Sequence, residues 1–293
     1  MKNKICLILV VLLFTVFGLG SGSSSSDSDK SSSNVSAGSD ASTKTSATID
    51  EQVIFDQEGV TITAKEIVED SIWGQGIKIL IENNSNNDIT VTADAMAVNG
   101  YMITDYLYED VTSGSKANAT MYCLSTELEN AGIDSIGEVD VWFKLINPNT
   151  YDTIYEQSEP TIIKTSAFDT MDTSLNIDGV EVMNQNGVKA VVQYVDEDSF
   201  WGTSVLVYIE NNSSDDIYLS SDNMSINGFM VNGYLYSYVK AGYKAFDEIT
   251  VFESDLEDND IDSIDSIKLN FSCINANTFS SFNSDSVTID VNK

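Results

Sequence analysis

Apolar and polar residues alternate along much of this chain, which is the pattern of short β-strands with one buried face. Alternate residues from Ile77 to Ile81 are expected to face a core, and the polar run from Asn83 to Asp88 predicts a turn before a second strand at 89–98. Asn99-Gly100 then predicts a type I′ hairpin, because both residues tolerate the positive φ angles of that turn. The pattern therefore predicts antiparallel β structure.

The same pattern returns at a fixed offset of 128 residues, which indicates a duplicated domain. Trp73-Gly74 recurs as Trp201-Gly202, and Asn99-Gly100 recurs as Asn227-Gly228. About seven strands per copy is typical of an immunoglobulin-like sandwich. The predicted fold class is all-β, with two tandem immunoglobulin-like β-sandwiches at 51–166 (the first repeat) and 174–293 (the second repeat).

Each repeat is also expected to contain one short helix. Thr126-x-x-Glu129 and Ser254-x-x-Glu257 both match the capping box, in which the first and fourth residues satisfy backbone groups at a helix start. Gly132 supplies a helix stop in the first repeat, because glycine readily adopts the left-handed conformation that ends many helices.

The residues before the repeats predict export. Lys2 and Lys4 precede an apolar run from Ile5 to Phe17, so 1–22 is predicted to be a signal peptide or anchor, with cleavage favoured because the run is shorter than a spanning helix. It resembles a lipoprotein leader, but position 22 is Gly22 where a lipidated cysteine is expected. Residues 23–50 are rich in serine and cannot bury a core, which predicts a disordered linker. The expected location is extracytoplasmic, either secreted or tethered to a bacterial cell envelope.

The charge and the composition narrow the possible functions. The chain has 46 acidic and 14 basic residues, a formal charge of −32, and no histidine. A field of this sign repels phosphate backbones, so we expect no nucleic-acid partner. The lack of histidine excludes Ser-His-Asp and Cys-His triads and removes the commonest zinc ligand. We therefore expect no catalytic residues, no cofactor and no resident metal.

The cysteines and the acidic clusters can be explained without a metal-binding or redox site. Cys123 aligns with Val251 and Cys273 with Leu145, so both are predicted to be buried thiols that act as small hydrophobic residues. A calcium loop starting at Asp255 would need glycine where Asp260 stands. A solvated acidic surface is favoured, with weak divalent cation binding as the alternative.

Tryptophans are the candidate contact residues. Trp73 and Trp201, flanked by Asp70 and Asp198, could stack on a sugar or a protein partner, although burial at one end of each sandwich is favoured. Strand parity turns Trp142 outward, and its counterpart is Asn270. An exposed Trp142 would mark either a contact between domains or a binding face.

The motifs Ile-Glu-Asn-Asn-Ser at 81–85, Val-Asn-Gly-Tyr-Met at 98–102 and Ala-Gly-Ile-Asp-Ser-Ile at 131–136 resemble those of secreted or lipid-anchored proteins of gut Clostridia and their relatives. These proteins carry immunoglobulin-like modules of uncharacterised function. The resemblance covers both repeats, roughly 53–165 and 175–291. The resemblance implies an immunoglobulin-like fold and an extracytoplasmic location, and it implies no activity.

The expected function is an exported, non-catalytic binding or structural module that presents two duplicated domains to an unknown protein or glycan at the cell surface. Membrane contact is expected only through the N-terminal segment. Two alternatives remain open. One is a hydrolase of envelope polysaccharide that uses paired carboxylates, and the other is a purely architectural spacer.

Overall fold

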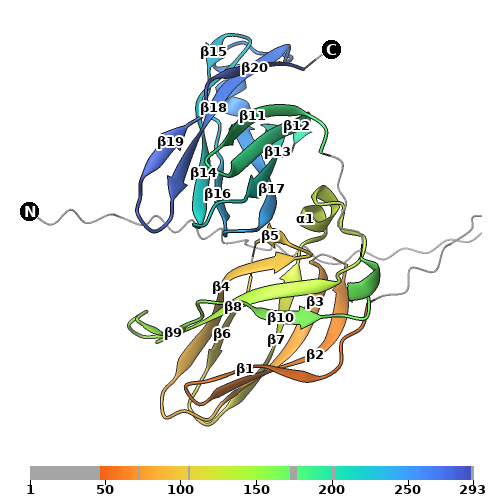
Figure 1. Ribbon diagram of the computed structural model, residues 1–293, viewed down its shortest axis with the longest axis vertical. Coiled ribbons are helices and arrows are strands. Elements are labelled where there is room, and N and C mark those ends of the chain that lie inside the picture. The colour runs from red at the N-terminus through yellow and green to blue at the C-terminus, as the bar shows by residue number, and fades with distance from the viewer. Residues whose placement is uncertain (1–46, 72, 105, 172–176, 200–201, 292–293) are drawn as a thin grey trace, which may run out of the picture. The chain divides into compact units, whose positions relative to one another are not determined.

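The fold of the protein comes from a computed structural model that describes residues 47–71, 73–104, 106–171, 177–199 and 202–291 (Figure 1). The described chain is mostly β-strand, with two short α-helices and strands arranged in three sheets. The signal segment, almost all of the serine-rich linker, Cys6 and Trp201 lie outside the described residues. No helix in the described part is both long enough and apolar enough to cross a membrane.

The first repeat supplies one complete sheet and part of a second. The complete sheet has the order β1-β2-β3-β7, formed by β1 (Gln52–Gln57), β2 (Val60–Asp70), β3 (Gly74–Asn83) and β7 (Lys116–Cys123). The other strands are β4 (Ile89–Val98), β5 (Tyr101–Ile103), β6 (Tyr108–Val111), β8 (Glu138–Ile146), β9 (Thr153–Glu156) and β10 (Thr161–Lys164). The expected alternation is present in β3, where Ile77, Ile79 and Ile81 are all buried.

The second repeat forms corresponding strands about 128 residues further along the chain. One group has the order β17-β13-β12-β11, formed by β11 (Val180–Gln185), β12 (Val188–Ser199), β13 (Gly202–Asn211) and β17 (Lys244–Phe252). A separate six-stranded sheet contains β14 (Ile217–Ile226), β15 (Phe229–Met230), β16 (Tyr236–Val239), β18 (Ser266–Asn275), β19 (Ser281–Asn283) and β20 (Val287–Asp290).

One short parallel pairing joins the two repeats into a single ten-stranded sheet. β5 of the first repeat pairs with β17 of the second, with Tyr101 opposite Lys244 and Met102 opposite Ala245. The Lys244 amide donates to the Gly100 carbonyl at 3.1 Å. The sheet is therefore continuous across the boundary that the sequence places between two separate domains.

Each repeat has its own hydrophobic core, and the second core also recruits residues from the first repeat. The core of the first repeat lies between its four-stranded sheet and its strands β4, β8 and β10. The core of the second repeat includes Cys273, and it also contains Ala95, Ala97, Met102 and Trp142. The prediction that Cys123 and Cys273 are buried thiols is confirmed. Burial raises the pKa of the Cys273 thiol to about 11.

The two Asn-Gly hairpins have the predicted backbone. Asn99 and Gly100 have φ angles of 51° and 85°, and Asn227 and Gly228 have 51° and 88°. The Asn99 side chain also holds the chain that enters β8, because its Oδ1 accepts from the Gly137 amide at 2.8 Å. Asn227 accepts from the Asp265 amide at 2.9 Å in the same way. Each asparagine therefore shapes a turn and anchors a distant strand.

A buried asparagine explains the Ile-Glu-Asn-Asn-Ser motif. The Asn83 Nδ2 group donates to the carbonyls of Asn87 and Val111, at 2.8 and 2.9 Å, and its Oδ1 accepts from the Ser85 amide and hydroxyl. Asn211 makes the corresponding four bonds in the second repeat. Because an unpaired buried amide is costly, this complete set fixes the turn after β3 and β13.

Both short helices exist, but the predicted capping boxes are wrong. Helix α1 (Ser125–Asn130) follows Leu124 and helix α2 (Glu253–Glu257) follows Phe252, so apolar residues occupy the capping positions and make no side-chain cap. Thr126 and Ser254 lie two residues beyond the capping positions, because each chain passes almost directly from β7 or β17 into its helix.

The helix ends are alike, although the residues differ. Gly132 has a φ angle of 63°, and the Ile133 amide donates to the Leu128 carbonyl at 2.7 Å. At the equivalent place Asp260 has a φ angle of 54°, and Ile261 donates to Leu256 at 3.0 Å. At this helix end, only the second repeat therefore has a residue with a side chain in the left-handed region, which is unfavourable for L-residues other than glycine.

These helix ends give a paired stability test. Asp260→Gly should raise the free energy of unfolding by up to about 1 kcal/mol, since it removes the strained Cβ, and Gly132→Ala should lower it by about 1 kcal/mol. Urea denaturation of both variants measures the two changes. Equal effects of the same sign would contradict the left-handed assignment.

Candidate functional site

Trp142 forms a contact between the repeats, which is one of its two predicted roles, and it is buried there rather than exposed as a binding face. The side chain is 3% exposed and points away from the core of its own repeat into that of the second repeat. Its ring meets the Tyr243 ring edge-on at 5.3 Å, and the Lys240 ammonium lies 4.9 Å from the ring centre. Strand parity found the outward direction correctly, but it carried no information about what covers that face.

A buried carboxyl lies beside this contact. The Tyr243 hydroxyl donates to Asp140 Oδ2 at 2.7 Å, whereas the buried Asp140 Oδ1 has no hydrogen-bond partner among the described residues. Burial raises the pKa of Asp140, and the Tyr243 hydrogen bond and the Lys164 charge only partly offset this. We use the name repeat joint for the β5–β17 pairing together with Trp142, Asp140 and Tyr243.

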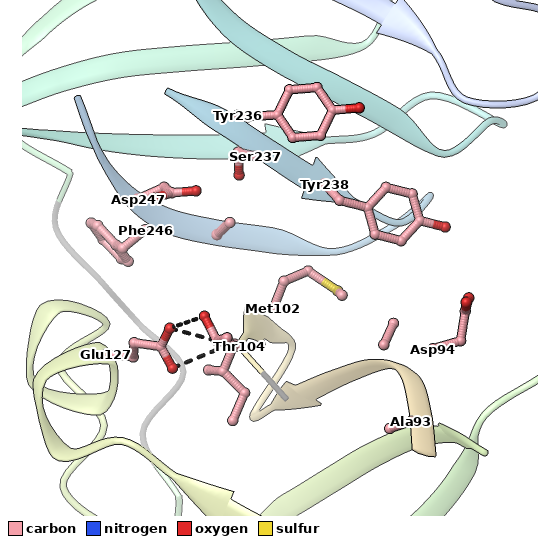
Figure 2. Close-up of a pocket in the computed structure, with 13 residues that line it drawn as sticks. Ala93, Asp94, Met102, Thr104, Glu127, Tyr236, Ser237, Tyr238, Phe246 and Asp247 are labelled. Atoms are coloured by element: carbon pink, nitrogen blue, oxygen red, sulfur yellow. Dashed lines mark hydrogen bonds between the residues drawn. The ribbon is translucent and has the colours of Figure 1, made fainter. Parts of the chain in front are cut away.

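A pocket of about 310 Å³ opens beside the repeat joint (Figure 2). Glu127 on α1 reaches it and accepts hydrogen bonds from the Thr104 amide at 3.2 Å and from the Thr104 hydroxyl at 2.5 Å. Asp247 on β17 and Asp94 on β4 line the same pocket. Acidic residues from both repeats therefore line this pocket, with Asp94 on the opposite side from Glu127 (Figure 2).

The electrostatics of this pocket do not divide its acids into different roles. Burial raises the pKa of Glu127, and the Thr104 hydrogen bonds oppose the shift. Burial raises the pKa of Asp247 as well, opposed mainly by the Glu248 amide. The pKa values of both carboxyls are therefore shifted in the same direction by burial, and hydrogen bonds oppose the shift in each case.

The second candidate site is a surface hollow of about 360 Å³ on the first repeat. We call it the aromatic hollow and define it by Trp73, Tyr106, Tyr108 and Tyr122. The Trp73 ring lies 6.2 Å from the rings of both Tyr106 and Tyr122. Trp73 is 46% exposed, so the favoured prediction that it is buried is wrong.

Local contacts position these rings. The Trp73 amide donates to the Asp70 carboxylate at 3.0 Å, which holds the turn between β2 and β3. Tyr122 comes from β7, and Tyr108 begins β6. The sequence analysis singled out Trp73 and Asp70 but not the three tyrosines. The sequence feature that could have identified Tyr106 and Tyr108 is the Tyr106-Leu107-Tyr108 motif, which recurs at 234–236. In this motif a buried leucine stands between two exposed rings.

The second repeat presents aromatic residues differently. Trp201 and the Asp198 side chain lie outside the described residues. Tyr234, Tyr236 and Phe252 are exposed, and the Tyr234 and Phe252 rings lie 5.1 Å apart. Thr250 replaces Tyr122 and forms a bridge with Tyr234 through two backbone hydrogen bonds of 2.9 and 3.0 Å.

The acidic clusters are used within the fold. Asp255 accepts from the Asn232 amide at 3.1 Å and from its side-chain nitrogen at 3.0 Å, and Glu197 accepts from the Ile264 amide at 3.1 Å. Within the described ranges, no group of three or more cysteine or acidic residues is arranged to hold a metal ion.

Comparisons with known proteins add little to this picture. No protein-family model matches the chain, and no curated protein matches it. A solved structure, a protein of unknown function from Porphyromonas gingivalis W83, is similar at 10% identity with a TM-score of 0.22. The match covers 84% of this chain and 96% of that one.

We expect mild acidification to strengthen the repeat joint. The carboxyls of Glu127, Asp140 and Asp247 have raised pKa values in the folded state, so folding binds protons and their contribution to stability is lost as the pH rises through those values. The free energy of unfolding should therefore be higher at about pH 5 than at pH 7, as measured in urea. Glu127→Gln should reduce this difference, whereas Asp285→Asn at an exposed position should not. An unchanged pH dependence in Glu127→Gln would contradict this assignment.

Trp142→Asn should selectively weaken the repeat joint. The change installs the residue found at the equivalent position 270, removes a buried ring, and should cost about 3 kcal/mol or more. Calorimetry should show the two repeats unfolding separately. Trp73→Ala is the matched control, since removal of a half-exposed ring should change stability far less. One unshifted transition in Trp142→Asn would contradict this prediction.

Proposed function

We propose that this protein is an exported, non-catalytic module of a bacterial cell surface, in which two immunoglobulin-like β-sandwiches contact a protein or glycan. The N-terminal sequence supports export. The placing of one core between strands of two sheets in each repeat supports the sandwich assignment. The observation that carries the binding role is the aromatic hollow, where four aromatic residues gather on the surface of one repeat.

The chemistry of the aromatic hollow favours an uncharged glycan. Trp73 and Tyr108 offer exposed ring faces, on which the C–H faces of a sugar ring can stack. Tyrosine hydroxyls and the Glu109 carboxylate offer polar contacts at the rim. The formal charge of −32 disfavours anionic ligands. Neutral oligosaccharides therefore fit this surface better than acidic peptides or phosphorylated ligands.

The hydrolase alternative would use the acidic pocket instead. The pKa values of two partly buried carboxyls in this pocket, Glu127 and Asp247, are shifted in the same direction, and Glu127 is already held by Thr104. This arrangement suits a structural contact between repeats better than a proton donor paired with a nucleophile. The spacer alternative predicts that the aromatic hollow has no ligand at all.

Trp73→Ala should abolish or strongly weaken glycan binding. We expect the full chain to bind a subset of neutral glycans on an array, and removal of a central ring should weaken binding about 30-fold, equivalent to about 2 kcal/mol. Titration calorimetry with the best-bound oligosaccharide measures the change. Tyr151→Ala removes a more exposed ring outside the aromatic hollow and should leave the affinity unchanged.

Three results would count against this proposal. Absence of binding to every glycan would favour the spacer, and equal binding by Trp73→Ala would move the site elsewhere. Cleavage of a bound polysaccharide that is lost in Glu127→Gln would favour the hydrolase.

A further inference from the structure

The second repeat carries a hairpin whose counterpart is buried in the repeat joint. In the first repeat, Tyr101 and Met102 are 3% and 9% exposed, because they pack against the second repeat. At the equivalent places, Phe229 and Met230 are 50% and 64% exposed. The Asn-Gly turn before them has the same backbone angles in both repeats. The second hairpin is therefore built like the first but is left uncovered.

The first repeat carries the complementary surface. In the second repeat β17 lies between β13 and β5, whereas its counterpart β7 pairs with β3 alone among the described strands and ends its sheet. Lys116 and Ala117 of β7 repeat the Lys244 and Ala245 that receive the first hairpin. Ala245 is buried there, but Ala117 is partly exposed at the edge of its core.

The charges at these two surfaces are compatible. Beside the repeat joint, Glu127 of α1 lies close to Asp247 of β17, and the charge of Asp247 raises the pKa of Glu127 further beyond the effect of burial. In the second repeat, Asp255 takes the place of Glu127, and in β7 Ala119 takes the place of Asp247. A hairpin placed on β7 would therefore bring its acid to an uncharged position.

Lys116 adds a favourable contact. In the repeat joint the Lys244 ammonium lies 5.4 Å from the centre of the Tyr101 ring. Lys116 would stand opposite Phe229 in the same way while it is ion-paired with Glu82 of the neighbouring strand, and a cation over an aromatic face is attractive. The apolar contact would be smaller than in the repeat joint, because Asn270 and Ser115 replace Trp142 and Tyr243. The contact is therefore expected to be weaker than the one inside the chain.

We propose that β15 of one copy of this chain adds in parallel to β7 of the next, so that copies associate head to tail through a second version of the repeat joint. Phe229 lies opposite Lys116 and Met230 opposite Ala117, and Met230 covers the open edge of the first repeat's core. The two surfaces belong to different repeats, so each added copy leaves one of each unused. Association of this kind is open-ended and depends on concentration.

The first test compares two exposed phenylalanines in the full chain with Cys6→Ser. Sedimentation velocity up to about 1 mM should show the average mass rising with concentration. Phe229→Lys should weaken this association at least about tenfold, because it removes the ring from the contact and places a second ammonium beside that of Lys116. Phe279→Lys changes another exposed ring of the same repeat and should have no effect. A constant monomer mass for the unsubstituted chain, or equal effects of both variants, would overturn the proposal.

The second test fixes the direction of association. Chains carrying Met230→Cys are mixed with chains carrying Ala117→Cys, both with Cys6→Ser, and oxidised with copper–phenanthroline. Adjacent strands bring such positions within the Cα separation that a disulfide needs, so the mixed dimer should be the main cross-linked product. Val180→Cys, exposed on β11, replaces Met230→Cys in the control and should not cross-link to Ala117→Cys. A dimer formed only between two Met230→Cys chains would overturn the head-to-tail arrangement.

Both tests are independent of glycan binding. Phe229 lies outside the aromatic hollow, so Phe229→Lys should leave glycan affinity unchanged while it weakens association. Failure of the self-association and failure of the proposed function can therefore be told apart.

Discussion

The parallel pairing of β5 with β17 is the contact on which the rest of this structure depends. Two residues of the first repeat, Tyr101 and Met102, lie against Lys244 and Ala245 and turn strands from both repeats into one continuous sheet. That pairing buries Trp142 in the core of the second repeat. It also brings Glu127 and Asp247 to the same pocket (Figure 2). Without it the repeats would be two separate cores with exposed aromatic edges.

Residues that the two repeats share stabilise the turns and the core of each repeat, and residues that differ between them determine which surfaces are exposed. Asn83 and Asn211 make the same four hydrogen bonds, so the turns that close the two cores are alike. The pair Trp142 and Asn270 differs, as does the exposure of Met102 and Met230. The hairpin of the first repeat is therefore covered by the second repeat, whereas the equivalent hairpin of the second repeat is exposed.

The acidic residues of this chain differ in their effect at the surface and where the repeats meet. The excess of acidic residues gives the chain a negative charge, which repels anions. Where the repeats meet, burial makes the charged forms of Asp140, Glu127 and Asp247 costly, and this raises their pKa values. The repeat joint therefore contains groups that respond to pH, whereas the aromatic hollow depends on ring faces.

The sequence by itself determined the features that depend on near neighbours along the chain. Alternation identified the buried isoleucines of β3, the Asn-Gly pairs predicted the positive φ angles, and comparison of the repeats identified Cys123 and Cys273 as core residues. Only the tertiary structure decided what covers each surface. Strand parity shows which way Trp142 points but not that Tyr243, about a hundred residues away, lies against it. The exposure of Trp73 could not be predicted from the sequence for a similar reason, because the residues around it come from strands that are distant in sequence. Contacts between distant segments are set by how whole sheets pack, and a local pattern of residues carries no record of them.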